Sequence, residues 1–258
     1  MAITISPAGI DDIKPLVRLN EAAFSWMYST ILFDGPLKES TIDALAEQRI
    51  KSHKEVEKSE AQESPAKKFF GFKAVDDTTG EIVGEARWMI YYEDEVLTKS
   101  IEEEVEDRIN PPMPQMQVQP TAEFVRILST TKRETLAVPS DSGATAESNA
   151  PIRLRKRVYL QVLAVHPHHQ RKGIGRKLIQ WGLDEADRLG LIAYLEATAD
   201  GARLYEQTGF EKVKDVYMDL RPFSVEEDIP IRVSLFISLY MVSFKVNEII
   251  VDDETAQI

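Results

Sequence analysis

A glycine-containing run at residues 170–176, QRKGIGR, lies where a predicted loop becomes a helix. Gly173 and Gly175 let the backbone approach a ligand closely, and the first N–H groups of a helix have no intrahelical acceptor. The helix dipole also favours negative charge there, so the run predicts a site for a pyrophosphate or a similar compact anion. Two glycines by themselves are equally typical of a tight turn. The candidate ligand-binding residues are Gln170, Arg171, Lys172, Gly173, Ile174, Gly175 and Arg176.

Two side chains downstream of this run are of types that transfer protons. Tyr205, in the helical segment ARLYEQTGF, fits a half-buried packing residue with a satisfied hydroxyl. Glu196, in the apolar segment LIAYLEAT, is a candidate base, as is Glu85 in a predicted hairpin. Strand alternation could instead turn either carboxylate outward as an ordinary surface group.

Three histidines, His166, His168 and His169, precede the glycine run. No carboxylate or distant fourth ligand accompanies them, and Pro167 between two of them merely steers the chain. The sequence therefore predicts no metal site.

The elements that must position these residues are clearly marked. VYLQVLAV from residue 158 predicts a strand, and small or apolar residues at helical spacing predict a helix from the glycine run to Gly190. LIAYLEAT predicts a second strand, parallel to the first because the helix forms a crossover between them. We further expect strands at 3–6, 211–220 and 233–245, helices at 10–24, 41–58 and 200–207, and a hairpin of 69–76 with 82–92.

Residues 93–156 are predicted to be an insertion between strands. A charged helix is expected at 93–110, the run PPMPQMQVQP is expected to lack regular structure, and SDSGATAESNAP at 140–151 resembles a flexible polar loop. Residues 24–36, FSWMYSTILFDGP, fit either a buried connector or one wall of a substrate pocket.

Composition narrows the class of protein. A chain of 258 residues with 43% hydrophobic content can form a single mixed α/β domain. No basic segment followed by an apolar run opens the sequence, and no stretch approaches a membrane span, so we expect an intracellular, cytoplasmic protein that does not bind membranes. The absence of cysteine excludes disulfides and an acyl-cysteine intermediate.

The distribution of charge points to the kind of ligand. A net charge of −12 argues against a nucleic-acid partner. Residues 153–177 nevertheless hold eight Lys or Arg and no Asp or Glu, which favours a compact anionic ligand in this stretch, although a solvated basic surface would look the same. The acidic remainder would suit a partner that carries positive charge.

At this point the residues resemble the GNAT superfamily of N-acetyltransferases, whose acetyl-CoA loop reads Gln/Arg-x-x-Gly-x-Gly/Ala. Gln170, Gly173 and Gly175 match that loop without a gap, and the preceding LQVLAVHP, the helix GIGRKLIQWGLDEADRLG and the later ARLYEQTGFE match the family's order and spacing. The resemblance covers about 65 residues, and the pattern of residues is similar to that of fungal members of the family. It implies a GNAT-like fold, a mixed α/β sheet whose strands splay apart to form a cofactor cleft.

The resemblance also implies roles for individual residues. The backbone of Leu163, Ala164 and Val165 would pair with the pantetheine arm of acetyl-CoA, and main-chain N–H groups of residues 171–176 would hold its pyrophosphate. Tyr205 would be the general acid that protonates the departing thiolate. Thr198 stands where the family often has Asn; it can donate and accept a hydrogen bond but cannot copy an amide.

These observations predict direct acetyl transfer from acetyl-CoA to a primary amine, with the oxyanion held by a strand N–H near Leu163. The alternative is a non-catalytic acyl-CoA-binding protein. A third possibility, a Rossmann-type dinucleotide-binding protein, fits less well, because Leu178 replaces the third small residue and HPHHQRK separates the glycines from the strand. Neither the acceptor nor the oligomeric state follows from any motif.

Overall fold

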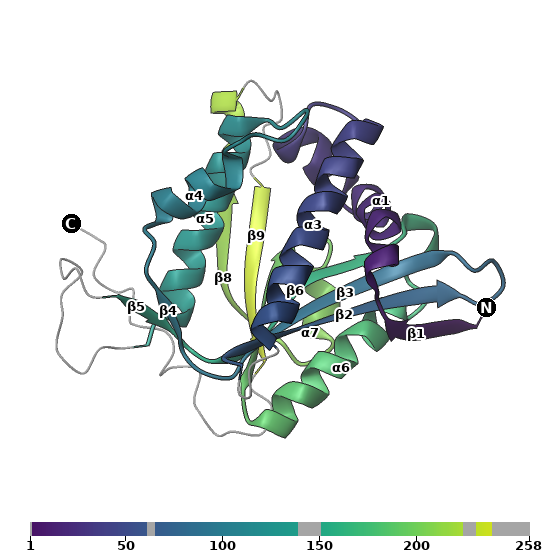
Figure 1. Ribbon diagram of the computed structural model, residues 1–258. Helices are drawn as coiled ribbons and strands as arrows, with labels where there is room; N and C mark the ends of the chain where they lie inside the picture. Colours follow the sequence, from purple (N-terminus) through teal and green to yellow (C-terminus); the bar gives the residue numbers. More distant parts are fainter. Residues whose placement is uncertain (1, 61–64, 139–150, 224–230, 239–258) are drawn as a thin grey trace.

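The computed structural model of the chain describes residues 2–60, 65–138, 151–223 and 231–238. Within these ranges, seven strands form one sheet in the order β1-β2-β3-β6-β7-β9-β8, and β4 pairs with β5 in a separate ribbon (Figure 1). The strands are β1 (Ile3–Pro7), β2 (Lys67–Asp76), β3 (Ile82–Tyr91), β4 (Glu95–Leu97), β5 (Ile152–Leu154), β6 (Arg157–Val165), β7 (Ile192–Thr198), β8 (Glu211–Met218) and β9 (Ile231–Ser238). Only β6 and β7 pair in parallel in the described sheet, which confirms the predicted mixed α/β architecture.

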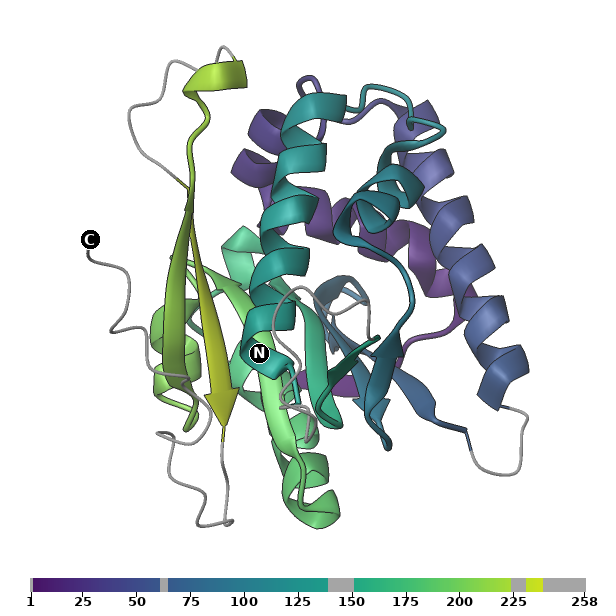
Figure 2. The same cartoon turned by 90° about the vertical axis from the view of Figure 1, so that its left-hand side faces the viewer.

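Helices cover both faces of the sheet. The α-helices are α1 (Ile13–Ala23), α2 (Ser25–Met27), α3 (Glu39–Glu60), α4 (Ile101–Ile109), α5 (Val118–Leu136), α6 (Ile174–Leu189) and α7 (Ala202–Glu206); a π-helical turn spans Tyr28–Leu32, and short 3₁₀ turns span Ile10–Asp12, Pro167–His169 and Arg221–Phe223. Figure 2 shows α3, α4 and α5 grouped on one side, with α6 at the opposite end of the molecule. Leu16 and Leu19 of α1 pack on Ala164, whereas α6 packs on the other face of β6.

The parallel pair comes apart part-way along its length. β6 and β7 are in register from Arg157 opposite Ile192 to Leu160 opposite Leu195, and no further. Beyond that point β6 continues beside β3 as far as Val165, while β7 continues beside β9 as far as Thr198. A bulge in the β3–β6 ladder at the same level leaves Gln161 without an opposite residue. The predicted strand splay is therefore present.

A close contact between a glycine and a tryptophan fixes α6 against the sheet. A Cβ added to Gly182 would lie 2.3 Å from the ring of Trp88, so only glycine permits the helix to approach this closely. Trp88 is fully buried, and Trp181 stacks beside it and against Phe70 and Phe72, with ring centroids 4.7 Å from each phenylalanine. Trp181 is thus a packing residue, and the glycine run is held at a fixed place above the splay.

Most of the predicted elements are confirmed, but the insertion contains more structure than expected. Residues 93–110 are not one helix, because the strand β4 precedes α4. The prediction for residues 111–120 was partly wrong, since α5 begins at Val118 and continues for 19 residues. Residues 139–150 and 239–245, which include most of the predicted polar loop and the end of the last strand, lie outside the described residues.

None of the described helices is both long enough and apolar enough to cross a membrane.

Candidate active site

The glycine run forms a loop whose backbone N–H groups are not used by the helix that follows. Gly173 caps α6 with φ +79° and no side-chain cap, and Arg171 also has a positive φ of 58°. The first helical bond runs from Lys177 N–H to Gly173 O at 3.2 Å, so the N–H groups of residues 173–176 have no acceptor within the helix. Because the positive end of the α6 dipole lies here, the loop is suited to a pyrophosphate.

Side chains of the run brace the loop instead of extending from it. Lys172 Nζ donates to His168 O at 2.8 Å, and Gln170 Nε2 donates to Val165 O at 3.3 Å. Arg176 Nη2 donates to Gln207 O at 3.0 Å, which ties the start of α6 to the end of α7. In this geometry the backbone supplies the anion-binding groups, and the basic side chains hold the backbone in place.

Backbone groups of β6 face the open side of the splay. His166 N–H donates to Val83 O at 2.9 Å, so His166 and Val83 form a hydrogen-bonded pair in the antiparallel β3–β6 ladder. Hydrogen-bonded and non-hydrogen-bonded pairs alternate along such a ladder. The main chain of Ala164 therefore points towards β3, and the N–H groups of Leu163 and Val165 point into the splay. Of the three residues predicted to contact pantetheine, Ala164 is the one whose backbone N–H and C=O groups point towards β3 and away from the splay.

The short helix α7 closes the same region from the other side. Leu204 lies close to Gly175, whose added Cβ would be 3.0 Å from Leu204 Cδ2 and within 4 Å of Leu163 and Val165 side chains. Thr198, at the exposed end of β7, accepts a hydrogen bond from Gly201 N–H through its carbonyl at 3.1 Å. The predicted cofactor-binding residues are thus brought together around one end of the splay.

Tyr205 lies in the core beneath this closure. Its side chain is 7% exposed and packs edge-on against Phe210 and obliquely against Phe236. Burial raises the pKa of the Tyr205 hydroxyl well above its ordinary value, so the phenol keeps its proton at neutral pH. Tyr205 is therefore a packed aromatic residue, one of the two roles considered for it, and its acid role stays a prediction.

A cavity of about 670 Å³ lies on the face of the sheet that is opposite α6. Side chains from β3, β6 and β7 form its floor, and α1, α3, α4 and α5 supply its walls. Gln161 and Glu196, the first residues of β6 and β7 beyond their last pairing, both line it, so the cavity reaches the splay point. Tyr28 also lines it, whereas Ile31 and Phe33 are buried; the segment 24–36 is therefore both connector and wall.

Glu196 lies at the junction of cavity and splay, held by two tyrosines. Tyr159 Oη donates to Glu196 Oε2 at 2.7 Å, and Tyr194 Oη donates to Oε1 at 2.9 Å. Burial raises the pKa of the Glu196 carboxyl, and the two hydrogen bonds oppose that rise only in part. A carboxylate with a raised pKa at this position is suited to accept a proton.

Glu85, the other candidate base, has a different environment. Its carboxylate is 1% exposed, forms an ion pair with Arg49, and lies 3.6 Å from Arg87 Nε. If Glu85 accepted a proton, its carboxylate would lose the negative charge that neutralises the guanidinium groups of Arg49 and Arg87. The geometry therefore favours Glu196 over Glu85 as a base.

The basic stretch at 153–177 does not form one site, which corrects the expectation that it surrounds a single anion. Arg157 is 1% exposed, pairs with Glu95, and stacks 3.9 Å from the centroid of the Tyr91 ring. Arg153 pairs with Asp94 at 3.0 Å. Arg157 begins β6 and Arg153 lies on β5, whereas the glycine run follows the other end of β6, a strand about 26 Å long at the usual rise.

The three histidines cluster without additional ligands. The ring centroid of His166 lies 5.3 Å from that of His168 and 5.9 Å from that of His169, and His169 Nδ1 lies 4.0 Å from Asp76. Burial, followed by the neighbouring histidines, lowers the pKa of His166. Among the described residues no group of His, Asp or Glu side chains is arranged to hold a metal ion.

Comparison with known proteins agrees with this geometry. Residues 141–212 match the model of the acetyltransferase (GNAT) domain, which covers the glycine run, the splay and Tyr205. The segment 141–212 is thus similar to a GNAT acetyltransferase domain. A curated relative of this chain, the probable acyltransferase SID5 of Ajellomyces capsulatus, is 33% identical over 69 residues, 26% of this chain. That match spans about half (51%) of the length of the relative.

Solved structures share the fold over nearly the whole chain. Arylalkylamine N-acetyltransferase 2 from Aedes aegypti superposes with a TM-score of 0.57 and 12% identity, covering 93% of this chain and 99% of the mosquito protein. The polyamine N-acetyltransferase of Drosophila melanogaster gives a TM-score of 0.56 and 14% identity, covering 92% and 99%. At these identities the likeness establishes the fold, and it excludes the Rossmann alternative.

Proposed function

We propose that the protein transfers an acetyl group from acetyl-CoA directly to a primary amine. The observation that carries the proposal is the splay of β6 and β7, which has the glycine run at its outer end and the 670 Å³ cavity at its inner end. A ligand threaded through the splay would have its phosphates at the α6 N-terminus and its reactive end beside Glu196. The bound thioester would supply the activated acetyl group.

The chain's own residues have separable tasks in this proposal. N–H groups of residues 173–176 bind the pyrophosphate, and the Leu163 and Val165 N–H groups bind the arm and the developing oxyanion. Glu196 accepts a proton from the ammonium form of the acceptor, and its raised pKa makes that transfer less costly. Tyr205, protonated because burial raises its pKa, donates to the thiolate as it departs.

Release of free thiol from acetyl-CoA, measured across small primary amines and peptide N-termini, tests the proposal. We expect release that depends on the amine. Binding of CoA without thiol release from any acceptor, unchanged in Tyr205→Phe, would support the alternative, a non-catalytic acyl-CoA-binding protein.

Gly173→Asp tests the anion site separately. The variant strains a backbone position with φ +79° and places a carboxylate where phosphate should bind, so CoA binding should be lost. Gly80→Asp is a matched control, because Gly80 has φ +75° in the β2–β3 turn and, like Gly173, has open space around an added Cβ. Calorimetric titration with CoA should show binding in the Gly80 variant alone. Tight binding by the Gly173 variant would contradict the loop assignment.

A further inference from the structure

The cavity next to the splay differs in charge from the chain as a whole. The protein carries −12, yet the cavity is lined by four basic and three acidic side chains. The basic residues are Arg49, Arg87, Arg108 and Lys132; the acidic residues are Glu85, Glu104 and Glu196. A net acidic surface therefore surrounds a cavity that holds an excess of positive charge.

Pairing within the described residues leaves part of this positive charge unmatched. Glu85 is shared by Arg49 and Arg87, and Glu104 is bound at 2.8 Å by Arg133, which does not line the cavity. Lys132 forms no ion pair within the described part of the chain, although its charge lowers the pKa of Glu104 and of Glu196 against the effect of burial. Arg108 forms no ion pair there either. In addition, Arg49 Nη1 and Arg87 Nε are buried N–H donors without a hydrogen-bond partner there.

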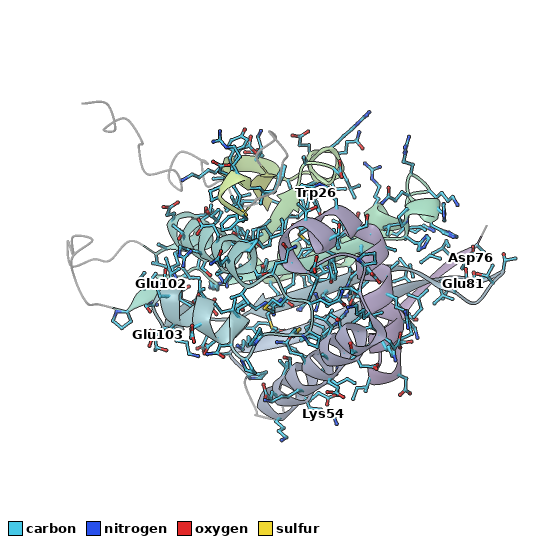
Figure 3. The ribbon with its side chains drawn as sticks, turned by 90° about the horizontal axis from the view of Figure 1, so that it is seen from above. Trp26, Lys54, Asp76, Glu81, Glu102 and Glu103 are labelled. Carbon is cyan, nitrogen blue, oxygen red and sulfur yellow. The ribbon has the colours of Figure 1, made fainter. Side chains whose placement is uncertain are left out.

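Of the acidic residues of α4, Glu104 lines the cavity and is bound by Arg133, whereas Glu102 and Glu103 do not line it. Glu102 and Glu103 are exposed on the outer surface of the helix, where Figure 3 shows them at the edge of the molecule. Glu102 pairs with Arg126 at 2.8 Å, and Glu103 caps α4 through Ser100. Arg108, in the last turn of α4, lines the cavity.

Tyr28 lines the same cavity as Arg87, Arg49 and Arg108. Burial raises the pKa of Tyr28, the charges of Arg87, Arg49 and Arg108 oppose that rise, and the charge of Glu85 adds to it. A guanidinium fork and a phenol hydroxyl are donors that bind a carboxylate. The cluster of Arg87, Arg108 and Tyr28, hereafter the cationic cluster, has the composition of an anion site.

The cationic cluster and Glu196 line the same cavity. Arg87 is on β3, which pairs with β6, and Glu196 is on β7 just beyond its pairing with β6. Two strand spacings place the backbones of Arg87 and Glu196 at least about 10 Å apart, because β6 and β7 diverge at this level. Since both groups line one cavity, a single acceptor molecule can contact both.

We propose that the acceptor is an amine that also carries a carboxylate or a similar anionic group, which the cationic cluster binds while the amine lies at Glu196. This inference rests on the proposed acetyl transfer and specifies its substrate class as amino acids and related zwitterions. The ammonium end of such an acceptor is consistent with attraction to the acidic exterior of the protein. Its anionic end determines the orientation of the acceptor inside the cavity.

The test compares three acceptors of equal chain length: an ω-amino acid, the n-alkylamine and the α,ω-diamine. With the full chain and acetyl-CoA, kcat/KM for the amino acid should exceed the other two by about 10- to 100-fold, the usual effect of one hydrogen-bonded charge pair. Equal rates with all three, or a preference for the diamine, would overturn the inference while leaving the proposed transfer intact.

Charge reversal at Arg108 provides the decisive variant, because this residue is exposed and its replacement does not disturb the core. Arg108→Glu should abolish the preference for the amino acid, mainly through KM, and raise the rate with the diamine. Arg153→Glu, at an exposed arginine outside the cavity, should leave the preference unchanged. A preference that survives Arg108→Glu would overturn the assignment.

A binding measurement separates failure of this inference from failure of the proposed function. Calorimetric titration of the amino acid in the presence of CoA requires no turnover. Binding that is lost in Arg108→Glu, with no thiol release in the wild type, would uphold the anion site and refute transfer. Thiol release without charge-dependent binding or preference would uphold transfer and refute the anion site.

Discussion

Replacing Glu196 by glutamine tests the proposed base without changing the shape of the cavity. The amide keeps an acceptor oxygen for one tyrosine and can donate to the other, so the contacts made by Tyr159 and Tyr194 need little rearrangement. It cannot take a proton from an ammonium group. Removal of a general base typically lowers the rate by about 10²- to 10⁴-fold, so kcat/KM for the amine should fall within that range while the KM for acetyl-CoA stays unchanged.

The pH dependence of the Glu196→Gln variant has a definite sign. Burial raises the pKa of Glu196 in the folded protein, so wild-type kcat/KM should fall at acid pH with an apparent pKa above the ordinary value of about 4.3. Glutamine should remove this acid limb. Ionising a group with a raised folded pKa costs stability as pH rises from the unfolded to the folded pKa. The stability of Glu196→Gln relative to wild type should therefore increase with pH across that window and then level off.

Glu85→Gln is the matched control, since it removes a carboxylate from the same cavity. Arg49 and Arg87 would lose their counter-charge, so this variant should be destabilised, by about 1–3 kcal/mol given that both arginines are partly exposed. It should keep the acid limb of the rate profile. Paired pH–rate profiles and urea unfolding curves distinguish the two variants. If Glu196→Gln retained a third or more of the activity, or kept the acid limb, the assignment of Glu196 as base would be refuted.

Two further substitutions test other parts of the site. Tyr205→Phe preserves the packing against Phe210 and Phe236 and should lower kcat by about 10²-fold or more without changing the affinity for acetyl-CoA. Because burial raises the pKa of Tyr205, the wild-type rate should show no alkaline decline assignable to this residue below pH ~10. Gly182→Ala should cost about 1–3 kcal/mol, despite the better helix propensity of alanine, since its Cβ would lie 2.3 Å from the Trp88 ring. Thermal unfolding should show a lower Tm, by about 2–4 °C per kcal/mol, and an unchanged Tm would contradict the packing described for α6.

The cofactor side of the site could be predicted from sequence because its determinants are local. Gly173 and Gly190 bound a helix whose buried positions recur at helical spacing, and two apolar strands flank it. The crossover rule then makes those strands parallel neighbours, which places the loop at the edge where they separate. The backbone directions of Leu163, Ala164 and Val165 needed the β3–β6 register, which the sequence does not specify.

The helix α5 was missed although its sequence contains a signal. Phe124, Ile127 and Leu128 have the i, i+3, i+4 spacing of an apolar helix face and pack against Ile31. The preceding proline-rich run suggested irregular structure. Pro120, however, lies in the first turn of α5, where a missing N–H costs nothing because no acceptor is available there. Proline in this position marks a helix start as well as a loop.

The acceptor side could not be predicted because its residues come from distant elements. Tyr28, Arg49, Arg87, Arg108 and Lys132 lie outside the segment that matches the GNAT domain model, whereas Glu196 and Gln161 lie inside it. The residues proposed to activate the amine thus belong to the shared core, and those proposed to recognise the remainder of the acceptor do not. Substitutions in α3, α4, α5 or β3 can therefore alter acceptor choice without disturbing the glycine run or the splay. For the same reason, the match to the GNAT domain model bears on the proposed cofactor side of the site and not on the choice of amine.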